Sequence, residues 1–141
     1  MKKVTGIGGV FFKSKDPKAS KGWYQKHLGI KSGPYGGTFE WRKAENPDSK
    51  GFTAWSIFDN KSDYYEPSKK DFMINYRVHD LEALIQELKN NDVEILGEIQ
   101  SFEYGKFAWI MDPDGLKIEL WEPVDDVYDS MGSDDDVNKM G

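Results

Sequence analysis

Few side chains in this sequence have the chemistry of a catalytic or metal-binding group. The 141 residues include no cysteine, which excludes a disulfide framework and a thiolate zinc site. The two histidines, His27 and His79, fall near the ends of expected helices, and we interpret both as structural or solvent-facing. The sequence does not indicate a catalytic Ser-His-Asp or Cys-His arrangement. The remaining candidates are Glu119, in a strand-like segment, and Arg77, one of two arginines.

The elements that would position these residues repeat along the chain with an offset of 64 residues. Asp16 and Ala19 fall on Asp80 and Ala83, and each aspartate follows a short β-rich run. Aspartate is a preferred N-cap, so a helix is expected after each one. Further strands follow in both halves, and the last two flank a turn at Asp112-Pro113-Asp114-Gly115. Each half therefore reads as βαβββ, and the polar stretch 59–71 reads as a linker.

The segment 104–120, YGKFAWIMDPDGLKIEL, carries a family resemblance. Asp-Pro-Asp-Gly followed four residues later by Glu-Leu resembles the closing hairpin of the vicinal oxygen chelate superfamily, which includes glyoxalases, bleomycin resistance proteins and extradiol dioxygenases. The first strand and helix are also similar, so that the resemblance covers roughly residues 4–123. It implies an α+β fold in which two tandem βαβββ modules form a curved mixed sheet around a cleft. The domain would span residues 1–124, with the first module at about 4–60 and the second at about 70–123.

The resemblance also indicates where a metal would bind. In metal-dependent members each module supplies one ligand from its first strand and one from its last, and these positions map to Gly9, Trp55, Met73 and Glu119. Only Glu119 can ligate a hard or borderline divalent cation, whereas a useful site needs about three protein ligands. We therefore expect no metal and no other cofactor.

The same positions predict a small-molecule site with aromatic and soft apolar walls. Strand alternation places Asn75 and Arg77 on the face of Met73. We expect Arg77 to pair with Glu119, although it could instead bind an anionic group of a ligand. Glu119 is the one catalytic candidate, as a general base. The predicted ligand-binding residues are Trp41, Trp55, Met73, Asn75, Arg77, Trp109 and Glu119.

Charge separates the body of the chain from its end. The net charge is −6, but residues 125–141 hold six aspartates and one lysine, which leaves the body nearly neutral. A neutral body has no electrostatic footprint for nucleic acid, and the sequence shows no apolar run long enough to span a membrane. Acidic segments with few apolar residues are typically disordered, so we expect a disordered tail at 125–141 that contributes nothing to the fold.

Two classes of function remain, with a third that is weaker. The first is a metal-independent protein that binds a small organic molecule, of the resistance or sequestration type. The alternative is an enzyme that acts on a small metabolite, of the glyoxalase or lyase type or like a dioxygenase. The third is an interaction module that uses the acidic tail. No signal peptide is recognisable at the N-terminus, so we expect a cytoplasmic protein, and the resemblance also implies a homodimer.

Overall fold

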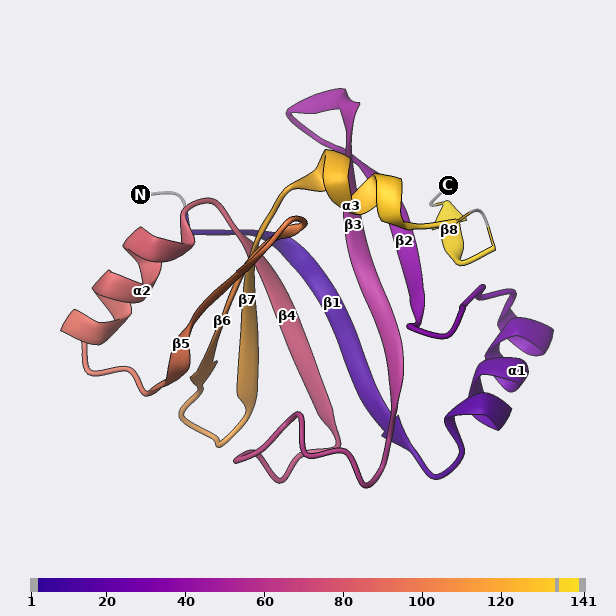
Figure 1. Cartoon of the computed structure of the whole chain (residues 1–141), viewed down its shortest axis with the longest axis horizontal. Helices are drawn as coiled ribbons and strands as arrows, with labels where there is room; N and C mark the ends of the chain where they lie inside the picture. Colours follow the sequence, from indigo (N-terminus) through magenta and orange to yellow (C-terminus); the bar gives the residue numbers. More distant parts are fainter. Residues whose placement is uncertain (1–2, 134, 140–141) are drawn as a thin grey trace.

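The computed structural model describes residues 3–133 and 135–139, and within them the two halves follow each other as expected (Figure 1). The first half contains β1 (Val4–Ser14), α1 (Pro17–Leu28), β2 (Gly37–Lys43) and β3 (Asn46–Asp59). The second half contains β4 (Phe72–Val78), α2 (Leu81–Asn90), β5 (Ile95–Phe102), β6 (Gly105–Met111) and β7 (Lys117–Pro123). Two short elements follow, α3 (Asp125–Met131) and β8 (Val137–Lys139). None of the helices in the described residues is long and apolar enough to cross a membrane.

Matching caps start α1 and α2 at the predicted offset. The Asp16 carboxylate accepts a hydrogen bond from the Ala19 backbone N–H at 3.1 Å, and Asp80 accepts one from Ala83 at the same distance. Each bond satisfies a donor that the first helical turn would otherwise leave without a partner. The left-handed Gly29, with φ of 70°, ends α1. The offset of 64 residues is therefore confirmed at the helix starts.

The strands form one curved mixed sheet of eight strands in the described residues, in the order β5-β6-β7-β4-β1-β3-β2-β8. Antiparallel pairing of β1 with β4 joins the two halves at the centre. Beside this junction β1 pairs with β3, and β4 with β7, in parallel. The predicted fold class, two βαβββ-like halves in an α+β arrangement, is confirmed.

The helices α1 and α2 pack against only one of the two faces of the sheet. Leu81, Leu84 and Ile85 of α2 pack with Ala108 and Leu120 in the largest apolar cluster, so α2 covers one face of the second half. α1 lies at the other end of the sheet, and its Tyr24 contacts Trp55. We call the opposite face, which these two helices leave open, the inner face.

Strand register differs between the halves by one residue. Asn75 of β4 pairs with Glu119, whereas Phe11, 64 residues before Asn75, pairs with Ser56 and not with Trp55. The stretch of chain between paired positions of β1 and β3 is thus one residue longer than the stretch between the corresponding positions of β4 and β7. A shift of one residue turns a side chain to the other face of a sheet. Trp55 therefore packs against Tyr24 and Phe12, away from the inner face.

The described part of the acidic tail, 125–133 and 135–139, is part of the fold, which corrects the expectation of disorder there. α3 lies above the inner face, and β8 pairs in parallel with β2, the edge strand of the first half (Figure 1). The Tyr128 ring contacts Phe52 and Trp121, and its hydroxyl hydrogen-bonds Thr38. The net charge of the segment did not predict these contacts, because a few side chains in the right positions are enough to dock a short segment. Residues 134, 140 and 141 lie outside the described residues.

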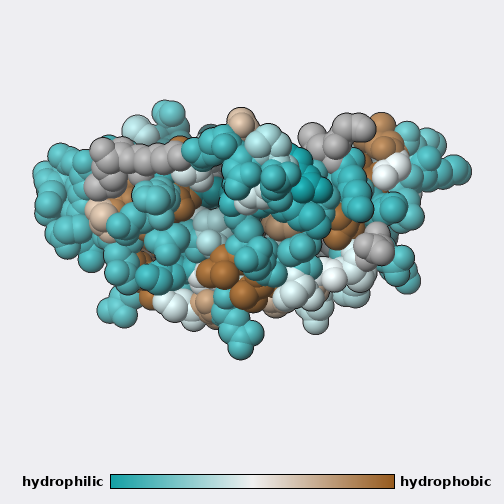
Figure 2. Space-filling model, turned by 90° about the horizontal axis from the view of Figure 1, so that it is seen from above, coloured by the Kyte–Doolittle hydropathy of each residue, from teal (hydrophilic) through white to brown (hydrophobic). Residues whose placement is uncertain are grey.

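β8 occupies a particular place in the sheet. In the second half β5 forms the edge, next to β6. The corresponding stretch of the first half, before β2, forms only an isolated bridge between Gly33 and Gly36. β8 from the end of the chain fills the position beside β2. Seen from above relative to Figure 1, the surface of the molecule is mostly hydrophilic with separate small hydrophobic areas (Figure 2).

Candidate functional site

Glu119 lies on the inner face of β7, and its carboxylate accepts three hydrogen bonds. The side chain is 4% exposed. It accepts hydrogen bonds from the Asn75 amide nitrogen at 2.7 Å, from the Trp109 indole N–H at 2.9 Å and from the Tyr64 hydroxyl. A buried carboxylate is costly unless donors surround it, and here three uncharged donors do so.

Two tyrosines of the linker close this part of the inner face. Tyr64 stacks on Phe58 with 5.5 Å between ring centroids, and Lys117 donates to the Tyr64 carbonyl at 2.7 Å. Tyr65 is completely buried and packs with Met73 and Phe11. Burial, and then the charge of Glu119, raise the pKa of Tyr64, so its hydroxyl stays protonated and donates. Sequence reasoning missed both residues; an adjacent aromatic pair in a polar linker was the available signal.

The structure brings three of the predicted site residues together, because Asn75 and Trp109 both donate to Glu119, while Met73 lies on the same strand face and packs with Phe11 and Tyr65. It does not bring Trp55 to them, because the register shift turns that ring toward α1. At Gly9 an added Cβ would lie 2.5 Å from the Phe11 ring, so Phe11 covers this position. Trp41 and Arg77 form a separate cluster.

These side chains do not fit a divalent metal. Of the four positions that the family resemblance indicates, only Glu119 carries a suitable oxygen, and both of its oxygens accept hydrogen bonds. Among residues 3–133 and 135–139 no group of three or more His, Cys, Asp or Glu side chains could hold a metal ion. A metal at Glu119 would therefore need further ligands that are not His, Cys, Asp or Glu side chains of the described residues.

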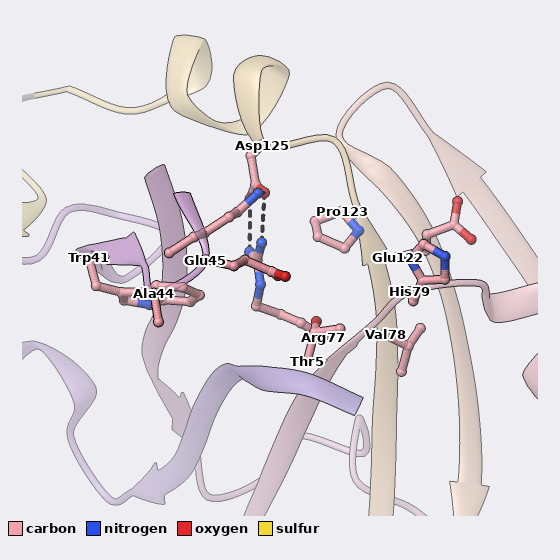
Figure 3. A pocket seen from close by; sticks show the side chains of 11 residues that line it. Thr5, Trp41, Ala44, Glu45, Arg77, Val78, His79, Glu122, Pro123 and Asp125 are labelled. Carbon is pink, nitrogen blue, oxygen red and sulfur yellow. Dashed lines mark hydrogen bonds and ion pairs between the residues drawn. The ribbon is translucent and has the colours of Figure 1, made fainter. Parts of the chain in front are cut away.

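Arg77 has a different partner from the one expected. It does not pair with Glu119 but forms a bidentate ion pair with Asp125 of α3, with N–O distances of 2.8 and 2.6 Å (Figure 3). Lys43 contacts the same carboxylate at 2.9 Å. Glu119 already has three donors, whereas Arg77, 3% exposed, needs an anion, and Asp125 of the tail supplies one. Sequence reasoning missed this because it treated the aspartates of the tail as solvated.

Asp125 makes this contact dependent on pH. Burial alone would raise its pKa, but hydrogen bonds from Arg77 and Lys43 outweigh burial and hold the pKa below its ordinary value. A depressed pKa contributes stability that is present above the unfolded-state value, about 3.9, and is lost as the pH falls through the folded-state value. We expect Asp125→Asn to cost about 2 kcal/mol at pH 7 and progressively less below about pH 4. Thermal unfolding of both proteins from pH 7 to 2 measures this, and a constant difference across the range would contradict it.

A cavity of about 450 Å³ lies beneath α3, and we call it the α3 cavity. Phe52 and Ala54 of β3 form its floor, while Tyr128 and Met131 of α3 form its roof. Tyr104, in the turn before β6, closes it from the second half of the chain. The charged side chains among its described lining are Asp129 and Asp136, both acidic. Its size lies within the range of ligand pockets, about 300–1,000 Å³.

A mixed sheet of this order, with two helix-backed halves and an inner face that is covered by aromatic rings, defines a two-module α+β architecture. The chain belongs to the Glyoxalase/Bleomycin resistance protein/Dioxygenase superfamily, whose family model matches residues 6–120. α3 and β8 lie beyond that match.

Solved structures of the same fold include methylmalonyl-CoA epimerases. The enzyme from Mycobacterium tuberculosis is 23% identical with a TM-score of 0.58, and the match covers 89% of this chain and 93% of that one. A variant of the Streptomyces coelicolor enzyme in complex with 2-nitronate-propionyl-CoA is 14% identical, with a TM-score of 0.61 and coverage of 86% and 99%. A superfamily member from Vibrio splendidus 12B01 is 17% identical, with a TM-score of 0.51 and coverage of 82% and 97%. At these identities the likeness shows the fold alone. The comparison with curated proteins finds no match.

Proposed function

We propose that this protein binds and sequesters a small organic molecule in the α3 cavity, without a metal ion. The observation that carries the proposal is the cavity itself, about 450 Å³ and lined mainly by aromatic and apolar side chains, on the inner face of the sheet. Apolar walls with a few polar groups are the usual composition of a ligand pocket. The Thr38 and Tyr128 hydroxyls, 2.7 Å apart, supply polar groups at its wall.

The lining favours a planar ligand with positive charge. Tyr104, in the turn before β6, and Tyr128, in α3, both line the cavity and are only partly buried, which suits stacking and cation–π contact. Asp129 and Asp136 add negative charge. The space around Glu119, in contrast, is filled by Tyr64 and Tyr65, so we place the ligand beneath α3 rather than at the residues that the sequence indicated.

An epimerase- or lyase-like reaction is the alternative, and the surroundings of Glu119 argue against it. A general base must reach the proton of a substrate with a free lone pair. The three hydrogen bonds to the Glu119 carboxylate stabilise its charge and leave one lone pair, on Oε1, but the side chain is only 4% exposed, so a substrate has no open approach to it. We therefore favour binding over catalysis at this residue.

Three probes with one ring system test the proposal. Tryptamine, indole and indole-3-acetate differ mainly in charge, and we expect saturable binding in the order tryptamine, indole, indole-3-acetate, with a Kd on the order of 1 mM or tighter for tryptamine. Calorimetry and ligand-observed NMR measure this. Prior treatment with EDTA should leave the affinity unchanged. Failure of all three probes to saturate, or loss of binding on chelation, would overturn the proposal.

A pair of neighbouring aromatic residues provides matched variants. Tyr104 lines the cavity, whereas Phe102 stacks on Tyr104 at 5.4 Å and is not among the lining residues. We expect Tyr104→Ala to weaken tryptamine binding about tenfold and Phe102→Ala to have little effect. Equal effects of the two substitutions would place the ligand elsewhere.

A further inference from the structure

Arg77 and its surroundings have the form of a receptor for a carboxylate. The guanidinium carbon lies 5.1 Å from the ring centroid of Trp41 and 5.5 Å from that of Trp121. These rings, and a hydrogen bond from Arg77 to the Phe52 carbonyl at 3.3 Å, fix the orientation of the planar fork. A fixed fork matches both oxygens of a carboxylate and loses little entropy on binding.

The receptor and its present occupant come from different parts of the chain. Lys43 and Trp41 belong to β2, Arg77 to β4 and Trp121 to β7, so the donors and the rings are all fixed by the sheet. The carboxylate belongs to Asp125, at the start of α3 and beyond the superfamily match. It receives both arms of Arg77 and the Lys43 ammonium. Asp125 therefore has the contacts that a bound carboxylate ligand would have.

A second cavity, of about 400 Å³, opens beside this ion pair, and we call it the Arg77 cavity. Figure 3 shows the Arg77 side chain extending toward Asp125, with Trp41 on one side and His79 and Glu122 on the other. The Trp41 ring and Pro123 offer apolar surface to the body of a ligand. Glu45 and Glu122 also line the cavity and disfavour a second negative charge on a ligand.

We propose that Arg77, Lys43 and Trp41 form a binding site for an aromatic monocarboxylate, which Asp125 occupies as an intramolecular ligand. A free carboxylate competes with Asp125 for the fork and places its ring in the Arg77 cavity. A tethered competitor acts at an effective concentration in the millimolar range or above, so binding to the native chain is weak and is coupled to release of Asp125. The site is separate from the α3 cavity and takes a ligand of opposite charge.

Benzoate and benzamide test this, since they share a ring and differ in charge. We expect benzoate, measured by calorimetry at constant ionic strength, to bind Asp125→Ala at least about tenfold more tightly than the native chain. It should also raise the Tm of that variant saturably, while benzamide does neither. Adding Arg77→Met to Asp125→Ala should abolish benzoate binding. If Asp125→Ala fails to fold alone, recovery of its native circular dichroism with benzoate supports the proposal.

Two further variants keep the test decisive. Asp126→Ala removes the same charge one residue further on and leaves the Arg77–Asp125 contact intact, so it should bind benzoate as the native chain does. Asp125→Asn keeps the shape of the side chain and should gain affinity for benzoate. The proposal would be overturned if the native chain, Asp125→Asn and Asp125→Ala bound benzoate with equal affinity. It would also be overturned if benzamide bound as tightly as benzoate, or if the variants were unfolded and benzoate did not restore their fold. Tyr104→Ala should leave benzoate binding unchanged, which separates this site from the α3 cavity.

Discussion

A chain that ends at Val124 should lose about 5 kcal/mol of its free energy of unfolding, or fail to fold. The truncation leaves Arg77, which is 3% exposed, without its carboxylate, and loss of one partner of a buried pair costs about 3–5 kcal/mol. It also removes the Tyr128 ring from Phe52 and Trp121, and the pairing of β8 with β2. For a domain of this size the Tm should fall by roughly 15 °C or more.

Urea and thermal unfolding measure this effect, and a chain that ends at Lys139 is the matched control. That chain keeps both α3 and β8, so its stability should equal that of the full sequence. Tyr128→Ala should account for about 2–3 kcal/mol of the loss on its own. An unchanged Tm after removal of 125–141 would restore the expectation from the sequence and show that the contacts of α3 contribute little.

Substitution of Glu119 should have the second large effect. In Glu119→Ala the Asn75 amide, the Trp109 indole N–H and the Tyr64 hydroxyl all lose their acceptor. A buried donor without a partner costs about 1–3 kcal/mol, and Asn75 is only 2% exposed. We expect a loss of about 4 kcal/mol in urea unfolding for Glu119→Ala. Glu119→Gln keeps one acceptor oxygen and should lose less than half as much.

A double-mutant cycle isolates the contact from Tyr64. Tyr64→Phe removes only the hydroxyl donor, and its cost should be about 1–2 kcal/mol in the native chain and close to zero in Glu119→Ala. Glu94→Ala, on an exposed residue of the same type, serves as the control for loss of a carboxylate. Equal stability of Glu119→Ala and Glu94→Ala would mean that water replaces the carboxylate fully and that Glu119 and its three donors do not form a structural unit.

Local sequence patterns predicted most of the fold. Asp16 and Asp80 start helices through the same capping bond, because a cap depends on residues within one turn. The family resemblance then fixed the order of the halves. The face of Trp55 could not be obtained in this way. An offset that holds at the helix starts fails by one residue in β3, and a slip of one residue reverses the face.

Partners distant in sequence were the main source of error at the site. Asn75 and Trp109 lie beside Glu119, because all three are on strands whose alternation is regular. The partner of Arg77 is 48 residues away, in a segment whose composition indicated disorder. Composition averages over a segment, whereas a single aspartate opposite a buried arginine is sufficient to dock it. Tyr64 and Tyr65 were missed for the same reason, in a linker that looked merely polar.

The place of β8 makes the first half of the chain depend on its last residues. β2 meets β8 through Thr38 and Val137, which lie about 100 residues apart in the sequence. During synthesis, β1, α1, β2 and β3 leave the ribosome long before residues 137–139 exist, so that the outer edge of β2 stays open in the nascent chain. Open edges pair readily with other chains, and contacts between distant residues form slowly. Translation that stalls before residue 137 should therefore yield an aggregation-prone product with an exposed sheet edge.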